Sequence, residues 1–280
     1  MYGSGFSYGN DMMTRNENTS FNGNIDYQRF LNRDRTSNIT LSYLFTTDPT
    51  TTESRNIYDP LPAGIPLTLN DLHSNSKMRG TEHTFQADYT TPLSKNQTLN
   101  AGAKFIGRRN TSDSKFYNII NGKEVFDSNS SVNYKNTQSI LASYIEYKLT
   151  LGKFSAKAGA RYEHTWEHVE FILGKGDDFK KNYGNLVPSA SFTYNIGAAV
   201  NVGVNYNMRI SRPGISFLNP YIDRSTPTVL TYGNPNLDVE ESHKVNLVFN
   251  AFTPKFMINL TLGEAFANNQ IEQYSFMDAN

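Results

Sequence analysis

The chain has 280 residues, of which 26 are Lys or Arg and 26 are Asp or Glu, so it carries no formal net charge. A neutral chain lacks the positive excess that phosphate binding requires, and we expect no nucleic-acid partner. The absence of cysteine excludes a disulfide scaffold, a thiol nucleophile and a Cys-ligated metal. No run of about 20 apolar residues is present, so we expect no membrane-spanning helix.

Alternation of apolar and polar residues is the main secondary-structure signal. After Phe154, one parity carries rings and alanines as far as Trp166, whereas the other carries Lys157, Arg161 and Glu163. A period of two places these sets on opposite faces of a sheet. The N-terminal segments alternate less regularly than the later ones. The residues that show this alternation lie, in chain order, within Ser20–Leu31, Ile39–Phe45, Gly80–Leu93, Leu141–Leu149, Phe154–Trp166, Val187–Ile196, Val200–Ser211 and Val245–Ala251.

The connections between these strands are of two lengths that alternate along the chain. The short ones are tight turns at Asn32–Thr36, Pro92–Gln97, Thr150–Lys153, Asn195–Ala198 and Thr253–Lys255. The long ones are polar loops at Asp48–Arg79, Asn110–Asn133, Glu167–Asn182 and Ser211–Glu240. Bacterial outer-membrane barrels have short periplasmic turns on one rim and long extracellular loops on the other, and the pattern predicts such a barrel.

Strand length and ring position favour a lipid environment over a soluble β-sandwich, the other fold that alternation permits. The alternating segments run for about 10–14 residues, and about 9–11 are needed to cross a bilayer at a tilt. Phe154 and Tyr162 are eight residues apart on the apolar parity, roughly 27 Å along a strand. When tilted, this distance matches the apolar band between aromatic girdles.

We therefore predict an all-β, antiparallel, up-and-down transmembrane β-barrel. Five hairpins give about ten strands, which is within the natural range for such barrels. Residues 1–280 show no domain boundary, and Met1–Gly5 has neither a basic start nor an apolar stretch. We expect a single domain, and this start is not a signal peptide.

A series of Pro and Gly motifs near the C-terminal end carries a family resemblance. The residues are Arg209-Ile210-Ser211-Arg212-Pro213, Leu218-Asn219-Pro220, Gly233-Asn234-Pro235-Asn236-Leu237 and Glu240-Glu241-Ser242-His243. This series resembles the outer-membrane β-barrel family related to TonB-dependent receptors. The resemblance implies the late portion of a barrel of about 22 strands with a plug in its lumen. On this resemblance we expect residues 1–280 to be a single partial barrel domain, with the plug domain and signal peptide absent. The residues themselves predict a loop, because proline ends the strand near Ser211 and Gly233-Asn234-Pro235 is a turn signal. Direct ligand contact is the alternative role.

Other candidate sites are weak, and we predict no catalytic, cofactor-binding or metal-binding residue and no cofactor. His164 and His168 lie roughly 13 Å apart on a strand, too far to share a metal. Gly174–Asp178 lacks the ending of a phosphate loop, although Asp177 and Asp178 leave a calcium site open. Glu240 and Glu241 point to opposite faces, which disfavours an acid pair for glycoside hydrolysis. No ligand-like neighbours accompany His73, His83 or His243.

Two functional hypotheses follow for a protein of the cell outer membrane. The first is uptake of a bulky nutrient, namely an iron chelate, a glycan or a peptide, by a TonB-dependent-type receptor that is not an enzyme. The resemblance then implies three partners, which are outer-membrane lipid, a plug domain and the TonB energy-transducing system. The second is a barrel adhesin or barrel enzyme that acts through its surface loops. The substrate-binding residues and the nutrient remain unknown at this stage, because loops confer specificity.

Overall fold

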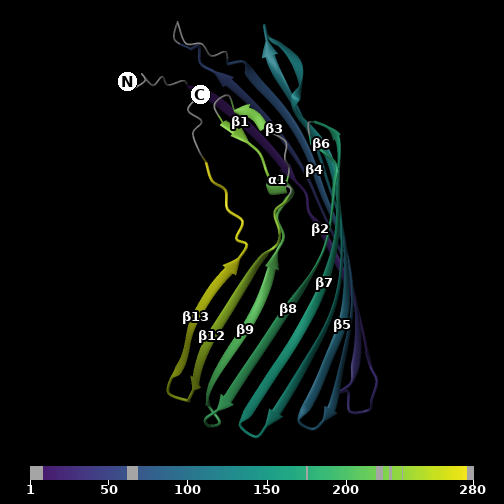
Figure 1. Cartoon of the computed structure of the whole chain (residues 1–280), viewed down its shortest axis with the longest axis vertical. Helices are drawn as coiled ribbons and strands as arrows, with labels where there is room; N and C mark the ends of the chain where they lie inside the picture. Colours follow the sequence, from purple (N-terminus) through teal and green to yellow (C-terminus); the bar gives the residue numbers. More distant parts are fainter. Residues whose placement is uncertain are drawn as a thin grey trace.

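The computed structural model describes residues 9–61, 69–174, 176–218, 223–226, 229–234 and 236–275. Antiparallel strands dominate it and form one tall, curved sheet whose strand order follows the chain (Figure 1). The strands of this sheet are β1 (Asn10–Asn18), β2 (Phe21–Phe30), β3 (Asn38–Tyr58), β4 (Asp71–Ser94), β5 (Gln97–Ile120), β6 (Lys123–Leu151), β7 (Phe154–Leu173), β8 (Phe179–Asn195), β9 (Val200–Ser211), β12 (Glu240–Phe252) and β13 (Met257–Asn268). Between β9 and β12 lie the short helix α1 (Ile215–Leu218) and a small separate hairpin of β10 (Asp223–Thr226) and β11 (Val229–Thr231).

The first two strands lie end to end along the same neighbour. Asn18 pairs with Thr50 and Phe21 pairs with Thr47, so β1 covers one half of β3 and β2 the other. The interruption is small, since the Thr19 N–H donates to the Pro49 carbonyl at 3.1 Å. The sheet is therefore ten strands wide, along the order β1, β3, β4, β5, β6, β7, β8, β9, β12, β13. This confirms the predicted antiparallel, up-and-down sheet of about ten strands.

All five predicted short turns are present, and they lie together on the lower rim in Figure 1. The turn between β6 and β7 consists of Gly152 and Lys153, with Gly152 at a φ of 56°. Glycine adopts this left-handed conformation without a Cβ clash, which allows the chain to reverse within two residues.

The predicted long loops are mostly wrong, because the strands continue through them. β3 extends to Tyr58 and β4 begins at Asp71, so Asp48–Arg79 is largely strand. The stretch Asn110–Asn133 is almost entirely strand and reverses at the turn Asn121–Gly122. β6 consequently has 29 residues, two to three times the predicted length of about 10–14 residues. Polar residues are frequent on both faces of the extensions, and the apolar residues there, such as Phe116 and Phe126, do not form a regular apolar parity. Neighbouring strands still pair their backbones.

The segment Asp127–Asn133, predicted as loop, lies inside β6 but leaves the ladder for part of its length. The pairing with β5 jumps from Val132 opposite Ser114 to Asp127 opposite Phe116. The intervening residues cap Asp127, whose carboxylate accepts hydrogen bonds from the Ser130 hydroxyl at 2.8 Å and the Asn129 N–H at 2.9 Å. Burial raises the pKa of Asp127, but these hydrogen bonds outweigh it and hold the pKa below its usual range. The segment is therefore an ordered bulge within the strand.

The two faces of the sheet differ sharply in chemistry. On the outer face, Tyr43, Phe85, Phe105 and Leu141 lie side by side across β3 to β6. The matching row on the inner face, from β3 to β7, is Ser42, Gln86, Lys104, Ala142 and Glu163.

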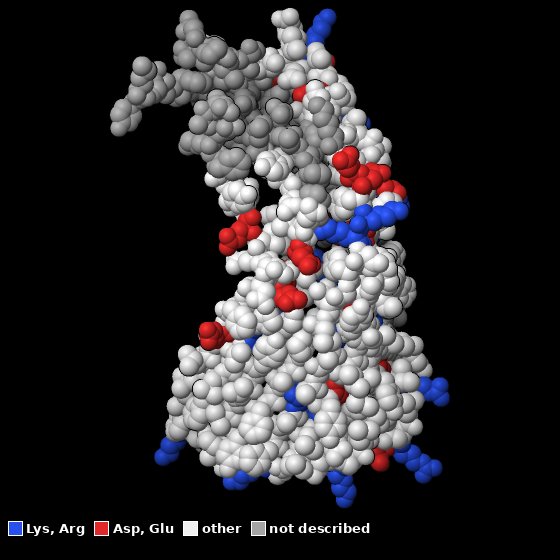
Figure 2. Space-filling model, viewed as in Figure 1, with Lys and Arg blue, Asp and Glu red and all other residues white. Residues whose placement is uncertain are grey.

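Exposure agrees with this division along β7, as predicted. Phe154 and Tyr162 are 49% and 48% exposed on the outer face, whereas Thr165 on the inner face is fully buried. Figure 2 shows Lys and Arg projecting from the rim of short turns and a largely uncharged surface directly above that rim. The apolar parity thus forms a continuous outer band.

Candidate functional site

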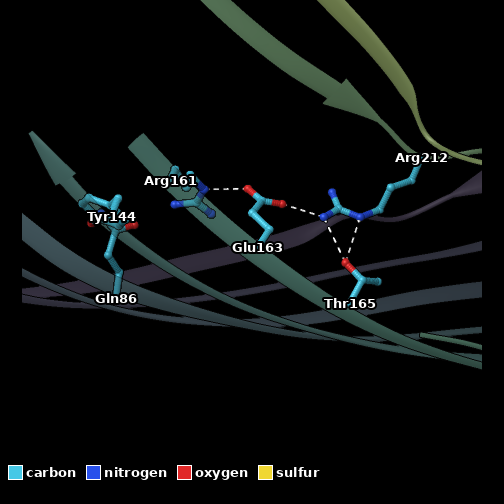
Figure 3. Close-up of polar contacts among 6 residues, drawn as sticks. All are labelled: Gln86, Tyr144, Arg161, Glu163, Thr165 and Arg212. Carbon is cyan, nitrogen blue, oxygen red and sulfur yellow. Dashed lines mark hydrogen bonds and ion pairs between the residues drawn. The ribbon is translucent and has the colours of Figure 1, made fainter. Parts of the chain in front are cut away.

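A polar cluster on the inner face joins the wall of the sheet to the connection after β9 (Figure 3). Glu163 of β7 lies at its centre and accepts hydrogen bonds from Arg161 Nε and Arg212 Nη2, both at 2.5 Å. The Arg212 guanidinium also donates to the Thr165 hydroxyl, from Nη2 at 3.0 Å and from Nε at 3.2 Å. Arg212 therefore links the connection to two neighbouring inward positions of one strand.

The cluster is shielded from water. The Glu163 side chain is 12% exposed and that of Arg212 is 16% exposed. Ion pairs that are held away from water are screened little by salt, and loss of one partner leaves the other charge unpaired. The Arg212–Glu163 contact therefore contributes more to the position of the connection than a pair on the open surface would.

A second group of polar side chains continues the cluster toward the short turns. The Arg161 guanidinium carbon lies 5.4 Å from the centre of the Tyr144 ring, a cation–π geometry. The Tyr144 hydroxyl donates to Asp88, and Gln86 Nε2 donates to Asp88 at 2.8 Å and to the Tyr144 oxygen at 3.2 Å. Figure 3 shows Tyr144 and Gln86 on the side of Arg161 away from Arg212. The charged side chains of this cluster therefore have partners within the inner wall.

Two further contacts lie farther from the short turns. Lys181 of β8 donates from Nζ to the carbonyl of Leu237 at 2.5 Å, which ties the end of the β9–β12 connection to the wall. Asn136 of β6 donates to Glu167 at 2.9 Å, and Glu167 is only 5% exposed. The connection is therefore anchored near both ends, by Arg212 and by the Leu237 carbonyl.

The motif residues build the connection between these anchors. β9 ends at Ser211, directly before Arg212 and Pro213, as the proline predicted. The Gly214 carbonyl accepts the N–H groups of Phe217 and Leu218 in α1, and the Asn234 N–H donates to the Phe217 carbonyl at 2.6 Å. The Leu218 side chain is fully buried. These contacts confirm the predicted role of the motif in shaping a loop, while Asn219, Pro220 and Pro235 lie outside the described residues.

The contact of Arg212 with the wall was not predicted from the sequence. A signal was present, because Glu163 is an acid on the inward parity of a strand at membrane depth and such a group requires a partner. The sequence gives no means to choose Arg212 over Arg209, since the choice depends on the path of the chain after Ser211.

The histidines are arranged mostly with aromatic rings rather than with each other. His164 and His168 lie on the outer face, and the nearest ring to His164 is Trp166, with centroids 4.3 Å apart. A hydrogen bond of 2.9 Å joins His83 Nδ1 to the Tyr43 hydroxyl. A hydrogen bond of the same length joins His243 Nδ1 to the Tyr206 hydroxyl. Such rings with a polar edge are suited to the interface between lipid and water.

The prediction that His73 has no ligand-like neighbours is wrong, because two glutamates contact it. Its Nδ1 lies 2.9 Å from Glu124 and its Nε2 lies 3.2 Å from Glu53. The two carboxylates contact opposite nitrogens of the ring, so they do not converge on one point. Within the described ranges, no group of three or more His, Asp or Glu side chains has the geometry of a metal site.

The remaining candidates have structural contacts. Asp178 accepts a 2.7 Å hydrogen bond from the Phe171 N–H and closes the connection between β7 and β8, whereas Lys175 of the glycine-rich stretch lies outside the described residues. Glu240 accepts hydrogen bonds from Ser242 and from the Ile271 N–H. Glu240 and Glu241 are consecutive in β12, so their side chains alternate between faces. In the part of the chain that the structure describes, no helix is long and apolar enough to cross a membrane.

The sequence profile of the outer membrane protein beta-barrel family matches residues 14–280. The chain belongs to this family. It is therefore an outer-membrane protein, and its apolar outer face contacts lipid while the polar cluster faces the lumen. No curated protein matches its sequence.

Solved structures of a transporter and of import and uptake receptors share the fold of this family member at low sequence identity. The ferric citrate transporter FecA is 14% identical with a TM-score of 0.62, over 94% of this chain and 36% of its own. The ferric-catecholate import receptor Fiu from E. coli K12 is 12% identical with a TM-score of 0.54, over 85% of this chain and 41% of its own. The ferric yersiniabactin uptake receptor FyuA from Yersinia pestis is 15% identical with a TM-score of 0.51, over 82% and 35%. The chain thus spans about two fifths or less of each receptor's length.

Proposed function

We propose that these residues form part of the wall of a TonB-dependent-type receptor, which takes up a bulky nutrient across the outer membrane. The nutrient is an iron chelate, a glycan or a peptide. A plug domain occupies the lumen, and the TonB system of the inner membrane supplies the energy. Proteins of similar fold are named as transporters and import receptors, which supports transport rather than catalysis as the role of this wall.

The polar inner face at membrane depth is the observation that carries this proposal. Lys104 and Glu163 lie in one row of inward-facing residues across the sheet. This row is only one residue along the strands from the outward-facing row of Phe85 and Phe105, so the two charges lie at the depth of the apolar band. A small closed barrel fills its interior with tightly packed side chains, whereas charges and small polar groups are suited to a wide lumen that holds water or a plug. The wall therefore fits a barrel with more strands than these ten.

The anchored connection after β9 also supports a lumen through which passage is controlled. Arg212 and the Leu237 carbonyl hold this connection against the inner wall at two points. A loop held on the lumen side lies where it restricts free diffusion of solutes. Energy-driven uptake requires such restriction, because an open pore would equilibrate the nutrient.

Uptake by cells tests the proposal. We expect a strain that lacks the protein to lose accumulation of one labelled nutrient from a panel of iron chelates, oligosaccharides and peptides. Accumulation should return with the wild-type gene and stop when a protonophore removes the energy of the inner membrane. Unchanged accumulation of every nutrient, together with lost surface adhesion or hydrolysis, would instead establish the adhesin or enzyme hypothesis.

A further inference from the structure

The lipid-facing surface contains a hollow of about 670 Å³ over β4, β5 and β6. Small side chains form its floor. Gly107 and Ser139 lie opposite each other, and in the next row Thr81 and Thr137 lie on either side of Arg109. Neighbouring rows of the outer face carry larger side chains such as Phe105, so the row of Gly107 and Ser139 forms a depression.

Two arginines without an ion-pair partner lie beside this hollow. Arg79 is opposite Thr111 and Arg109 is opposite Thr81, so the two are diagonal neighbours about 7–8 Å apart at the backbone. Both side chains are exposed, and neither forms an ion pair or side-chain hydrogen bond with another described residue. The next residue, Arg108, faces the lumen and is bound to Glu82 at 2.5 Å. Arg79 and Arg109 therefore place two uncompensated charges on the outer face.

The arginines lie at the edge of the apolar band. From the short turns up to and including the row of Gly107 and Ser139, the outer parity of β3 to β7 contains no Asp, Glu, Lys or Arg in these fully described strands, and Arg109 lies in the next row. A second hollow of about 520 Å³ lies within this band and is lined by rings and aliphatic side chains, including Tyr43, Phe85 and Leu141. Phe105 lines both hollows, so the polar hollow and the apolar hollow are adjacent.

We propose that this surface is a binding site for a phosphorylated glycolipid of the outer leaflet. The guanidinium groups of Arg79 and Arg109 bind a phosphate of the head group, since planar guanidinium matches phosphate geometry with two parallel hydrogen bonds. The hydroxyls of Thr81 and Thr137 contact the sugar, and acyl chains follow the apolar hollow toward the short turns. The proposed lipid site does not depend on which nutrient the protein takes up. It rests on the orientation in which the rim opposite the short turns lies outside the cell.

Binding of defined lipids to the protein, purified from its native outer membrane and delipidated in mild detergent, tests this site. Three probes are compared, namely phosphorylated lipid A, the same lipid after removal of its phosphates, and inorganic phosphate. We expect the phosphorylated lipid to bind about tenfold or more tightly than the dephosphorylated one, because charge-assisted hydrogen bonds are lost. Inorganic phosphate should not compete at equal concentration, because it lacks the acyl chains.

Three variants make the test specific. The Arg79→Gln/Arg109→Gln variant should weaken binding of the phosphorylated lipid by about tenfold or more. Gly107→Leu should also weaken it without a change in charge, because a Cβ at Gly107 meets only the Phe105 ring, at 3.5 Å, and the longer side chain fills the hollow. The control Arg55→Gln/Lys115→Gln removes the same charge farther from the apolar band, and binding should stay within about twofold.

Each opposite outcome overturns the proposal. Equal affinity for the two lipids would show that the protein does not recognise the phosphate. Equal weakening by the control variant would show that the lipid is attracted by the overall positive charge of the surface and not by a specific site. Competition by inorganic phosphate at equal concentration shows an anion site that holds no lipid. If the double arginine variant does not fold, unchanged binding by Gly107→Leu is sufficient to refute the site.

Discussion

Arg212 and Glu163 are 49 residues apart in the chain, yet the guanidinium of one lies 2.5 Å from the carboxylate of the other. We predict that Glu163→Gln releases the connection after β9, because Arg212 then loses its only charged partner among the described residues. Removal of one member of a shielded pair costs about 2–5 kcal/mol. Hydrogen exchange of the amides in residues 212–218 should accelerate accordingly.

Glu146→Gln is the matched control for this prediction. Glu146 also lies on the inner face and is paired, with Lys157 at 3.1 Å, but it does not contact the connection. Exchange in residues 212–218 should therefore be unchanged in the control. Equal acceleration in both variants would mean that general loss of lumen charge, rather than the Arg212 contact, opens the connection.

The sequence predicted the fold well wherever one parity was apolar. The alternation of Val200–Ser211 gives β9 with the same bounds, and all five short turns were located. The hydrophobic pattern determines which face meets lipid, and a shift of one residue would move every apolar side chain to the lumen. The register and face of the strands at membrane depth are therefore encoded locally.

The local alternation of apolar and polar residues predicted neither the strand extensions nor the polar cluster around Glu163. The stretch Thr50–Asn56 is polar on both faces, so its extended form depends on backbone pairing with β1 and β4 rather than on an apolar parity. The contact of Arg212 with Glu163 likewise depends on the path of an irregular connection. Both features are long-range results of folding that local periodicity does not contain.

The two faces of β9 should differ in their tolerance of charge. Val204 lies on the outer face, 45% exposed, between Phe192 and Leu247. Val204→Arg should destabilise the protein by about 2–4 kcal/mol near the bilayer midplane, because the guanidinium enters hydrocarbon. Asn205→Arg should cost much less, since the side chain faces the lumen and loses one hydrogen bond with Asn246. Unfolding in lipid vesicles measures both, and equal destabilisation would refute the assignment of faces.

The two rims should lie on opposite sides of the outer membrane. Asn121 occupies the turn between β5 and β6, and Gly152 the turn between β6 and β7 on the other rim (Figure 1). Both have positive φ in tight turns, so an inserted epitope tag disturbs little of the ladder. Antibody applied to intact cells should reach the tag at Asn121 only, and permeabilised cells should expose both. Access at Gly152 on intact cells would invert the orientation.

The isolated 280 residues should not form a closed pore. Within the described residues, β13 pairs only with β12, and β1 and β2 pair only with β3, so both edges of the sheet have unpaired backbone groups. Such groups are not tolerated in hydrocarbon, and edges of this kind aggregate in water. After refolding in detergent, the isolated chain should therefore migrate identically before and after heating and show no single-channel conductance. The complete receptor provides the positive control. Heat-modifiable migration together with stable conductance by the isolated chain would demonstrate a self-closed barrel and contradict this prediction.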